Sequence, residues 1–312
     1  MNNKTSLRVA AYAATISFLG LAAHSFASSY QSSIGKTTAD ALLEATRLDA
    51  HSDFLEAFAI ALNEPFDEFP DAMREAWAER TEELELAEDQ YEMRLQVFHQ
   101  VGHGRYLPEL DPAEFDAALT NTYFPFPVGQ TLVYEKTTAE GVERVEVTAL
   151  ADTIEIDDIE CRQVQDTAYL DGVLLEDTID WYAQHTNGDV WYMGEISKNY
   201  DEDGFLEDID GSWRHGKDGA QAGILMPGTP VIGQLYRQEY WIDEAEDVGR
   251  VVATNETVVV PAGTFTGCLK TEDGTALEPD AREFKYYAPG VGLVLEVDPE
   301  SGERLELIQI IP

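Results

Sequence analysis

Apolar residues recur at helical spacing over the first part of the chain, from about residue 37 to residue 119. Thr37 and Asp40 can cap a first helix. A second apolar stripe covers residues 54–62 and ends before Pro65. We therefore expect helices that pack against one another as hairpins in this region.

Two prolines mark further helix starts. Pro70 suits the first turn of a longer helix, whose apolar stripe ends near Gly102. The sequence Asp-Pro-Ala-Glu at residues 111–114 combines an N-cap, a proline at the first helical position and a glutamate three residues after the cap. It predicts another helix that begins at Pro112.

After Asn121 the pattern changes to an alternation of apolar and polar positions, in short runs separated by turn residues. Such runs are typical of strands joined by hairpins, and no helix-period segment intervenes, so the pattern predicts an antiparallel meander. A sheet of roughly ten strands tends to curl, close or split. The turn signals lie at residues 139–141, Asp171-Gly172, Asn187-Gly188, Asp203-Gly204 and Ser301-Gly302.

Two C-terminal segments carry proline and glycine inside apolar runs. We interpret residues 257–269 as one strand that Pro261 and Gly263 bend. Residues 285–297 are interpreted as a second strand, in which Pro289 and the following glycines mark a bulge. Both segments are expected to belong to the scaffold. The Gly- and Pro-rich residues 215–233 are expected to be irregular, as either a lid or an inert surface loop.

These patterns predict an α+β protein in which an N-terminal α-helical region packs on a large antiparallel β-meander that forms an open barrel or half-barrel. The predicted division is residues 1–27 as a signal peptide, residues 28–120 as the helical region and residues 121–312 as the sheet domain. The apolar, proline-rich segment from Tyr123 to Gly129 predicts a rigid junction between the two regions.

The N-terminus has the layout of a signal peptide. Lys4 and Arg8 precede a run almost without charge that ends at small residues around Ala27. We expect export to the periplasm or the medium with cleavage after Ala27, although an uncleaved anchor would have similar length. No later segment is apolar enough to form a stable membrane span.

The chain has 20 Lys and Arg against 60 Asp and Glu residues, and its formal net charge is −40. Such a surface repels nucleic acids and anionic lipids, so neither is expected as a partner. The charge is explained either by an acidic coat suited to a salty medium or by a cation-binding role.

Cys161 and Cys268 are the two cysteines of the chain. An exported protein meets an oxidising environment, so we expect a disulfide between them if their strands are neighbours. The alternative is a pair of buried free thiols.

No cofactor is expected, with a divalent metal as the alternative. Glu92, His99 and His103 fall near one helix face, and two histidines four residues apart with a carboxylate can bind zinc. The histidines can instead be solvated or interact with the helix end. Residues 201–204 resemble the start of a calcium loop, but Phe205 and Ser212 stand where oxygen ligands are needed, so a hairpin turn is favoured.

Aromatic pairs flank the predicted turn at Asn187, and the two members of each pair are expected to point to opposite faces of the sheet. They form either an ordinary sheet core or an aromatic-lined cavity for an apolar or sugar-like ligand, with polar contacts from two further residues. The candidate ligand-binding residues are Trp181, Tyr182, Trp191, Tyr192, Trp213, His215, Arg237 and Tyr240.

Several motifs of the sheet region resemble those of an uncharacterised family of exported bacterial proteins. The Val-Pro-Ala-Gly-Thr-Phe motif is also similar, more distantly, to periplasmic lipoprotein-carrier-like half-barrels, whose curved sheet wraps a hydrophobic cavity. That similarity implies an apolar ligand, and no catalytic residues are carried over. The motifs are Tyr123-Phe-Pro-Phe-Pro-Val-Gly129, Asp180-Trp-Tyr-Ala-Gln184, Asp189-Val-Trp-Tyr192, Val260-Pro-Ala-Gly-Thr-Phe265 and Tyr287-Ala-Pro-Gly-Val-Gly-Leu-Val294.

The leading functional prediction is an exported, soluble, non-catalytic binding or carrier protein for a small apolar or amphipathic ligand. One alternative is an exported hydrolase that depends on a metal at His99 and His103 or uses His215. A second alternative is an envelope protein whose acidic surface interacts with cations or a partner.

Overall fold

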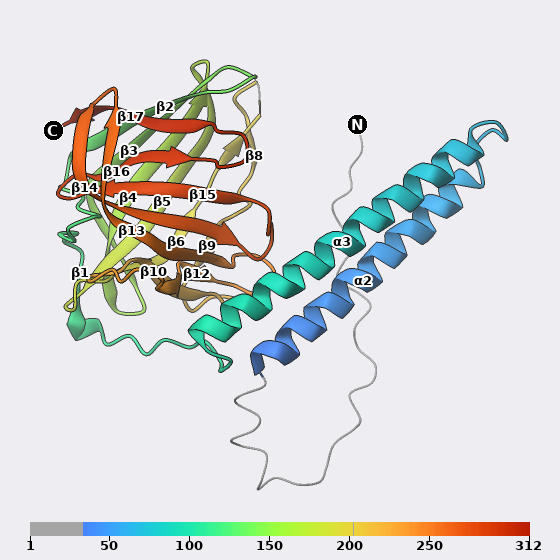
Figure 1. Cartoon of the computed structure of the whole chain (residues 1–312), viewed down its shortest axis with the longest axis horizontal. Coiled ribbons are helices and arrows are strands. Elements are labelled where there is room, and N and C mark those ends of the chain that lie inside the picture. Colours follow the sequence, from blue (N-terminus) through green and yellow to red (C-terminus); the bar gives the residue numbers. More distant parts are fainter. Residues whose placement is uncertain (1–33, 202) are drawn as a thin grey trace, which may run out of the picture.

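The computed structural model describes residues 34–201 and 203–312, so the predicted signal peptide lies outside the described part. Two long helices, α2 (Ile34–Ala61) and α3 (Phe69–Val101), run antiparallel as a hairpin, and the rest of the chain forms a curved β-sheet (Figure 1). Neither helix of the described part is long and apolar enough to cross a membrane. The predicted α+β architecture is confirmed.

The helix boundaries differ from the predicted ones at the start of the hairpin. The two expected stripes belong to one helix of 28 residues, because no proline or glycine interrupts the chain between them. Helix α3 agrees with its prediction. Pro70 and Asp71 lie in its first turn, and Gly102 ends it with a φ of 109° while its N–H donates to the Phe98 carbonyl at 3.0 Å.

The helix predicted at Pro112 is wrong. Asp111 does cap the chain, since its side chain accepts from the Ala113 N–H at 3.0 Å, but the helical geometry stops after one 3₁₀ turn, η1 (Pro112–Glu114). Phe115 then pairs with His185 as part of a short strand. The edge of the sheet and the burial of the Phe115 ring outweigh a local start signal that has no partner helix to pack against.

The helical hairpin projects from the barrel and meets it near the end of α3 (Figure 1). The two helices contact each other through a Phe54–Trp77 ring pair at 4.6 Å and a hydrogen bond of 3.0 Å from Tyr91 to Asp40. Few of their side chains are buried, and Phe66 at the hairpin tip is 94 % exposed. Local contacts therefore hold most of the hairpin.

The strands between residues 199 and 240 are short, and most of the others are longer. Their bounds are β1 (Phe115–Asp116), β2 (Thr131–Thr137), β3 (Val142–Ile156), β4 (Ile159–Leu170), β5 (Val173–His185), β6 (Val190–Ile196), β7 (Asn199–Tyr200), β8 (Leu206–Asp208), β9 (Trp213–Arg214), β10 (Gln221–Met226), β11 (Leu235–Arg237), β12 (Glu239–Tyr240), β13 (Asp247–Val260), β14 (Gly263–Thr275), β15 (Arg282–Ala288), β16 (Gly292–Val297) and β17 (Arg304–Ile311).

The sheet is an antiparallel meander that curls into a nearly closed barrel with one seam (Figure 1). Consecutive strands pair from β13 to β17 and from β2 to β6, and β17 pairs with β2. Strand β10 pairs with both β6 and β12, which brings the two ends of the meander together. Each turn signal predicted from the sequence joins two paired strands, so those predictions are confirmed.

The two C-terminal segments interpreted as single bent strands are hairpins instead. Pro261 and Ala262 are the turn between β13 and β14, where Val260 pairs with Gly263. Residues 289–291 are the turn between β15 and β16. A proline has no N–H for a ladder hydrogen bond and its φ suits a turn, so each run folds back at its proline.

The expected irregular structure of residues 215–233 is confirmed in part, because residues 215–220 and 227–233 are turns and irregular backbone, but the centre of the segment is a strand. Its centre is strand β10, whose Ile224 pairs with Trp191 of β6. Gly223 lies in this strand because the Gln238 backbone approaches it so closely that an added Cβ would lie 2.4 Å from the Gln238 carbonyl carbon. Gly223 therefore permits close backbone packing, and β10 closes the barrel through its pairing with β6 and β12.

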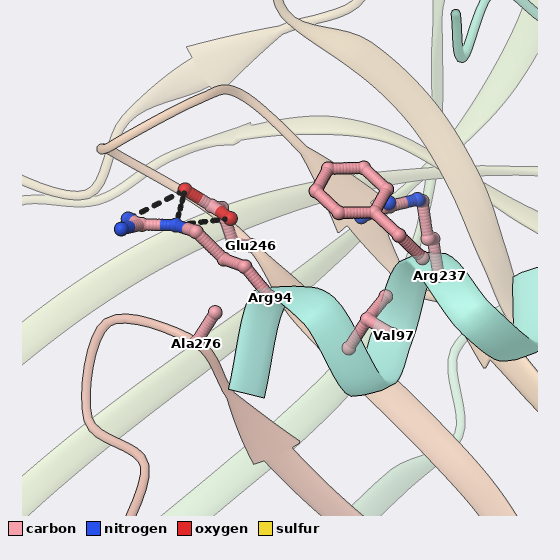
Figure 2. A pocket seen from close by; sticks show the side chains of 6 residues that line it. Arg94, Val97, Arg237, Glu246 and Ala276 are labelled. Atoms are coloured by element: carbon pink, nitrogen blue, oxygen red, sulfur yellow. Dashed lines mark hydrogen bonds and ion pairs between the residues drawn. The ribbon is translucent and has the colours of Figure 1, made fainter. Parts of the chain in front are cut away.

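A buried ion pair attaches the helical hairpin to the barrel. Arg94 of α3 is 2 % exposed and donates two hydrogen bonds of 2.9 and 3.1 Å to one Glu246 oxygen and one of 3.1 Å to the other (Figure 2). Arg94 also reaches Asp243 at 3.3 Å. The hollow beside this pair, lined by Val97 and Ala276, is too small for a water molecule. We call this contact the Arg94 junction.

Candidate functional site

The barrel interior changes from apolar at one end to polar at the other. Side chains two residues apart share a face of a strand, so Leu269, Thr271 and Asp273 of β14 all point inward. Leu269 belongs to the main core. Phe124 and Phe126, which come from the predicted rigid junction, are buried in the main core at the apolar end. The polar end is where acidic side chains replace the core.

Aromatic rings form a continuous wall across this interior. Tyr182 of β5 stacks on Tyr192 of β6 with ring centroids 4.9 Å apart, and Tyr192 meets the Trp213 ring edge-to-face at 5.2 Å. Phe124 contacts Tyr182 on the other side at 5.2 Å. We call these four residues the aromatic wall. Hairpin pairing of β5 and β6 places the two tyrosines side by side.

Buried carboxyl groups lie beside the aromatic wall. Asp180 and Glu195 are direct partners in the β5–β6 ladder, and the Tyr192 hydroxyl donates to Asp180 at 2.5 Å. The other members come from strands around the barrel, and their charges influence one another. We call the whole group the acidic interior: Asp166, Asp180, Glu195, Glu239, Asp247, Asp273 and Glu296.

Burial changes the protonation of these groups. It raises the pKa of Asp180 to about 7, although hydrogen bonding from Tyr192 opposes the change. Burial and the negative charge of Asp180 raise the pKa of Glu195 to about 8. Burial, followed by the charges of Asp247 and Glu195, raises the pKa of Glu239 well above its usual value. Part of the acidic interior therefore holds protons near neutral pH.

Lys285 of β15 lies among these carboxyl groups. Burial alone would lower its pKa, but the charges of Glu296, Asp273 and Glu283 outweigh burial and hold the pKa well above its usual value. Lys285 is 26 % exposed and Glu296 is 20 % exposed, so this end of the interior is in contact with solvent. The ion-pair distances from Lys285 are 3.6 Å to Asp273, 3.3 Å to Glu283 and 3.6 Å to Glu296.

Several buried polar atoms of this interior have no hydrogen-bond partner within the part of the chain that the structure describes. Such groups are uncommon in folded proteins, because leaving one unpaired costs about 1–3 kcal/mol. The Trp213 indole is near enough to Glu239 to affect its pKa, yet the two form no hydrogen bond of ordinary geometry. The atoms are Trp213 Nε1, Tyr236 Oη, Glu239 Oε2, Thr271 Oγ1 and Asp273 Oδ1.

The structure distributes the predicted ligand-binding residues over three places. Tyr182, Tyr192 and Trp213 line the interior. Trp181 and Trp191 point to the outer face, as expected for neighbours in a strand, and pack on a second apolar cluster together with Phe115. That cluster also contains Ile156, Ile159, Cys161, Ala183, Met193 and Ala222.

The remaining three predicted ligand contacts lie outside the interior. The Arg237 guanidinium stacks over the Tyr240 ring at 4.2 Å and over Phe98 of α3 at 5.3 Å, so both residues help to hold the helical hairpin. His215 follows β9, and its Nδ1 accepts from the Ala222 N–H at 3.0 Å. Burial lowers the pKa of His215, which favours the neutral ring.

The histidines proposed as metal ligands lie close together at the end of α3. His99 Nδ1 and His103 Nε2 are 3.2 Å apart. Within residues 34–201 and 203–312, no group of three or more His, Cys, Asp and Glu side chains is arranged to hold a metal ion. The site of Glu92, His99 and His103 therefore stays a prediction without structural support.

The predicted disulfide is wrong. Cys161 on β4 and Cys268 on β14 are both buried free thiols, and they belong to different apolar clusters. The strands β15, β16, β17, β2 and β3 separate β14 from β4 in the sheet. Burial raises the pKa of Cys161 to about 12, which keeps this thiol protonated.

Sequence reasoning missed the acidic interior. With 60 acids in the chain, single carboxylates carried little information. A usable signal was the alternation within strands, since Glu176, Thr178, Asp180 and Tyr182 occupy one face of β5. Which face points into the barrel was decided only by closure of the sheet.

Comparisons with known proteins found no matching family model, no matching curated protein and no matching solved structure. The resemblance to exported bacterial proteins and to lipoprotein carriers stays a prediction.

Proposed function

We propose that this chain is an exported, non-catalytic binding or carrier protein whose small amphipathic ligand occupies the polar end of the barrel interior. The observation that supports the proposal best is the set of five buried polar atoms of the interior that have no hydrogen-bond partner among residues 34–201 and 203–312. Trp213 belongs to the aromatic wall and Glu239 lies near it, and ligand sites in general combine apolar surface with a few convergent polar groups.

The gradient of the interior supports an amphipathic ligand over a purely apolar one. The apolar end, built from residues such as Leu132 and Leu269, offers contact to a hydrocarbon part. The acidic interior offers partners to a polar part. A wholly apolar ligand would offer no hydrogen-bond partner to Glu239 Oε2, Asp273 Oδ1 or Thr271 Oγ1, which have none among the described residues, and this disfavours its binding.

Tryptophan fluorescence tests the proposal directly. The mature protein is titrated with a panel of amphipathic small molecules, and we expect a subset to change the emission of the wild-type protein. The Trp213→Phe variant should lose that change, whereas the outer-face variant Trp181→Phe should retain it. Absence of binding across the whole panel, measured also by calorimetry, would exclude the proposed function.

A second candidate is a hydrolase without a metal. Asp180 and Glu195 are cross-strand partners, and pKa values of about 7 and about 8 suit proton transfer near neutral pH. Paired carboxyl groups of this kind serve glycoside hydrolysis. Turnover of nitrophenyl glycosides by the wild-type protein and not by Asp180→Asn would support this candidate, and lack of turnover across the panel would count against it.

A further inference from the structure

We propose that the ligand of this interior is an organic cation, a protonated amine or quaternary ammonium group that is joined to an apolar part. Its charged group would lie between the aromatic wall and the carboxyl groups of Asp180, Glu195 and Glu239. This inference depends on the proposed binding function and adds the chemical class of the ligand.

The charges of the interior are the first observation that favours a cationic ligand. Asp180, Glu239 and Asp273 are 8 %, 9 % and 6 % exposed, and each is a carboxyl group in a low-dielectric setting. Lys285 is already shared among three carboxylates at the solvent end. Buried charge is stable when it is paired, so a ligand that brings positive charge stabilises this arrangement. An anionic ligand would meet repulsion.

Two carboxyl oxygens without hydrogen-bond donors among the described residues are the second observation. Glu239 Oε2 and Asp273 Oδ1 are acceptors with no donor among the described residues. A protonated amine supplies N–H donors to such oxygens, and charge-assisted hydrogen bonds of this type are roughly twice as strong as neutral ones. A quaternary ammonium group has no N–H and pairs with the same oxygens through its charge alone. The Gln238 side chain already donates to the other oxygen of Asp273 at 3.0 Å, so one oxygen of this carboxyl is available.

The rings of the aromatic wall are the third observation that favours a cationic ligand. The faces of tyrosine and tryptophan rings attract cations, and aromatic rings beside carboxylates are the usual surroundings of quaternary ammonium ligands. Tyr192 links the two features, because its ring lies between Tyr182 and Trp213 while its hydroxyl donates to Asp180. A neutral ligand would pack against the rings but would gain no charge attraction from the carboxyl groups.

The same geometry favours an organic cation over a metal ion. The acidic side chains come from different strands with aromatic rings among them, and within the described ranges they form no metal-binding group. Metal ions of the Ca²⁺ type need six to eight oxygen ligands at short range. The neighbouring apolar end of the interior offers no ligands to a metal ion, but it offers contact to a hydrocarbon part.

Cation binding should release protons. Asp180, Glu195 and Glu239 hold protons near neutral pH, and a bound positive charge favours their ionised forms. The Trp213 indole on β9 lies near Glu239. The charged and titratable groups that face these three residues from the surrounding elements are Asp166 on β4, Glu176 and Tyr182 on β5, Tyr192 on β6 and Asp247 on β13.

Isothermal titration calorimetry of the mature protein with three octyl compounds tests the inference: octyltrimethylammonium, octanol and octanoate. We expect the ammonium compound to bind at least about tenfold more tightly than octanol, and octanoate to bind most weakly. The heat should differ between Tris and phosphate buffers for the ammonium compound, because protons are released, and not for octanol.

Variants separate the interior from the acidic surface. Glu239→Gln should weaken octyltrimethylammonium binding at least about tenfold and leave octanol binding unchanged. Glu155→Gln removes one charge from an exposed position of β3 and should change neither. Trp213→Phe keeps a ring in place and gives a second measure, with a smaller loss for the cation.

The outcomes distinguish two failures. If octanol binds as tightly as the ammonium compound, or if Glu239→Gln and Glu155→Gln act alike, the organic-cation inference is wrong while the binding function survives. If none of the three compounds binds and the wider fluorescence panel is also negative, the binding function itself is wrong.

Discussion

The barrel and the helical hairpin are held together by different means. The barrel buries large side chains such as Tyr134, Leu132 and Leu269 completely, whereas α2 buries only Gly35 and three alanines among its described residues. The hairpin depends on helical hydrogen bonds, local ring pairs and a few contacts of α3 with the barrel, among which the Arg94 junction is a buried ion pair. The difference teaches that the barrel sets the stability of the fold, while the hairpin can change its position if its attachment fails.

Loss of the Arg94 junction should separate the two regions. Arg94→Ala leaves Glu246 buried without its partner, and we expect a cost of about 3–5 kcal/mol to the docked state. Limited proteolysis should then cut the helical hairpin while the barrel stays resistant. Arg74→Ala on the same helix removes an exposed ion pair with Asp71 and should cost less than about 1 kcal/mol. Equal protease resistance of both variants would contradict the assigned role of the junction.

Truncation of one leucine in each region should show the contrast in packing. Leu132→Ala removes a fully buried side chain of the barrel core and leaves a cavity. It should lower the free energy of unfolding by about 2–5 kcal/mol. Leu48→Ala on α2, at a side chain that is 52 % exposed, should change it by about 0.5 kcal/mol or less. Urea denaturation followed by circular dichroism measures both. Similar losses would show that the hairpin contributes as much packing as the barrel.

Raising the pH should weaken the barrel more than the hairpin. Asp180 and Glu195 have folded-state pKa values of about 7 and about 8, above the ordinary 3.8 and 4.5, so the folded protein binds more protons between these limits. The free energy of unfolding should then fall as pH rises from 5 to 8, by up to about 1.4 kcal/mol per pH unit for each such carboxyl.

The control for this pH effect is the double variant Asp180→Asn, Glu195→Gln in high salt. Salt screens the repulsion of the acidic surface, and the variant removes the two buried titrations. Its stability should depend less on pH than that of the wild-type protein. A wild-type stability that stays constant or rises between pH 5 and 8 would contradict the buried carboxyl array.

Reduction should have the smallest effect. Cys161 and Cys268 are free and buried, so a reducing agent should leave Tm unchanged. Mass spectrometry after alkylation should show two modified thiols in the unfolded protein and slow modification in the folded protein. A Tm that falls on reduction would show that the cysteines are bonded after all.

Short-range signals in the sequence were dependable where the local chemistry had one outcome. Asn187-Gly188 and Asp171-Gly172 predicted hairpins correctly, because Gly188, Asp171 and Gly172 adopt the positive φ values of these turns at little cost. The prediction of a bent strand at Pro261 is wrong, because the residue lies in a turn. The fixed φ and missing N–H of proline are compatible with both structures. Asp111 started a helical turn that could not continue, because Phe115 was drawn into pairing with His185.

The sequence by itself determined the two regions, their secondary-structure types and the positions of most turns, because hydrophobic period and turn chemistry act over a few residues. Only the tertiary structure decided which side chains meet. Closure of the sheet placed Asp180, Glu195 and Glu239 around one aromatic wall, moved Arg237 and Tyr240 to the helical junction and kept Cys161 and Cys268 apart. These outcomes depend on strand order and on which face of each strand is enclosed, and no short stretch of sequence specifies either.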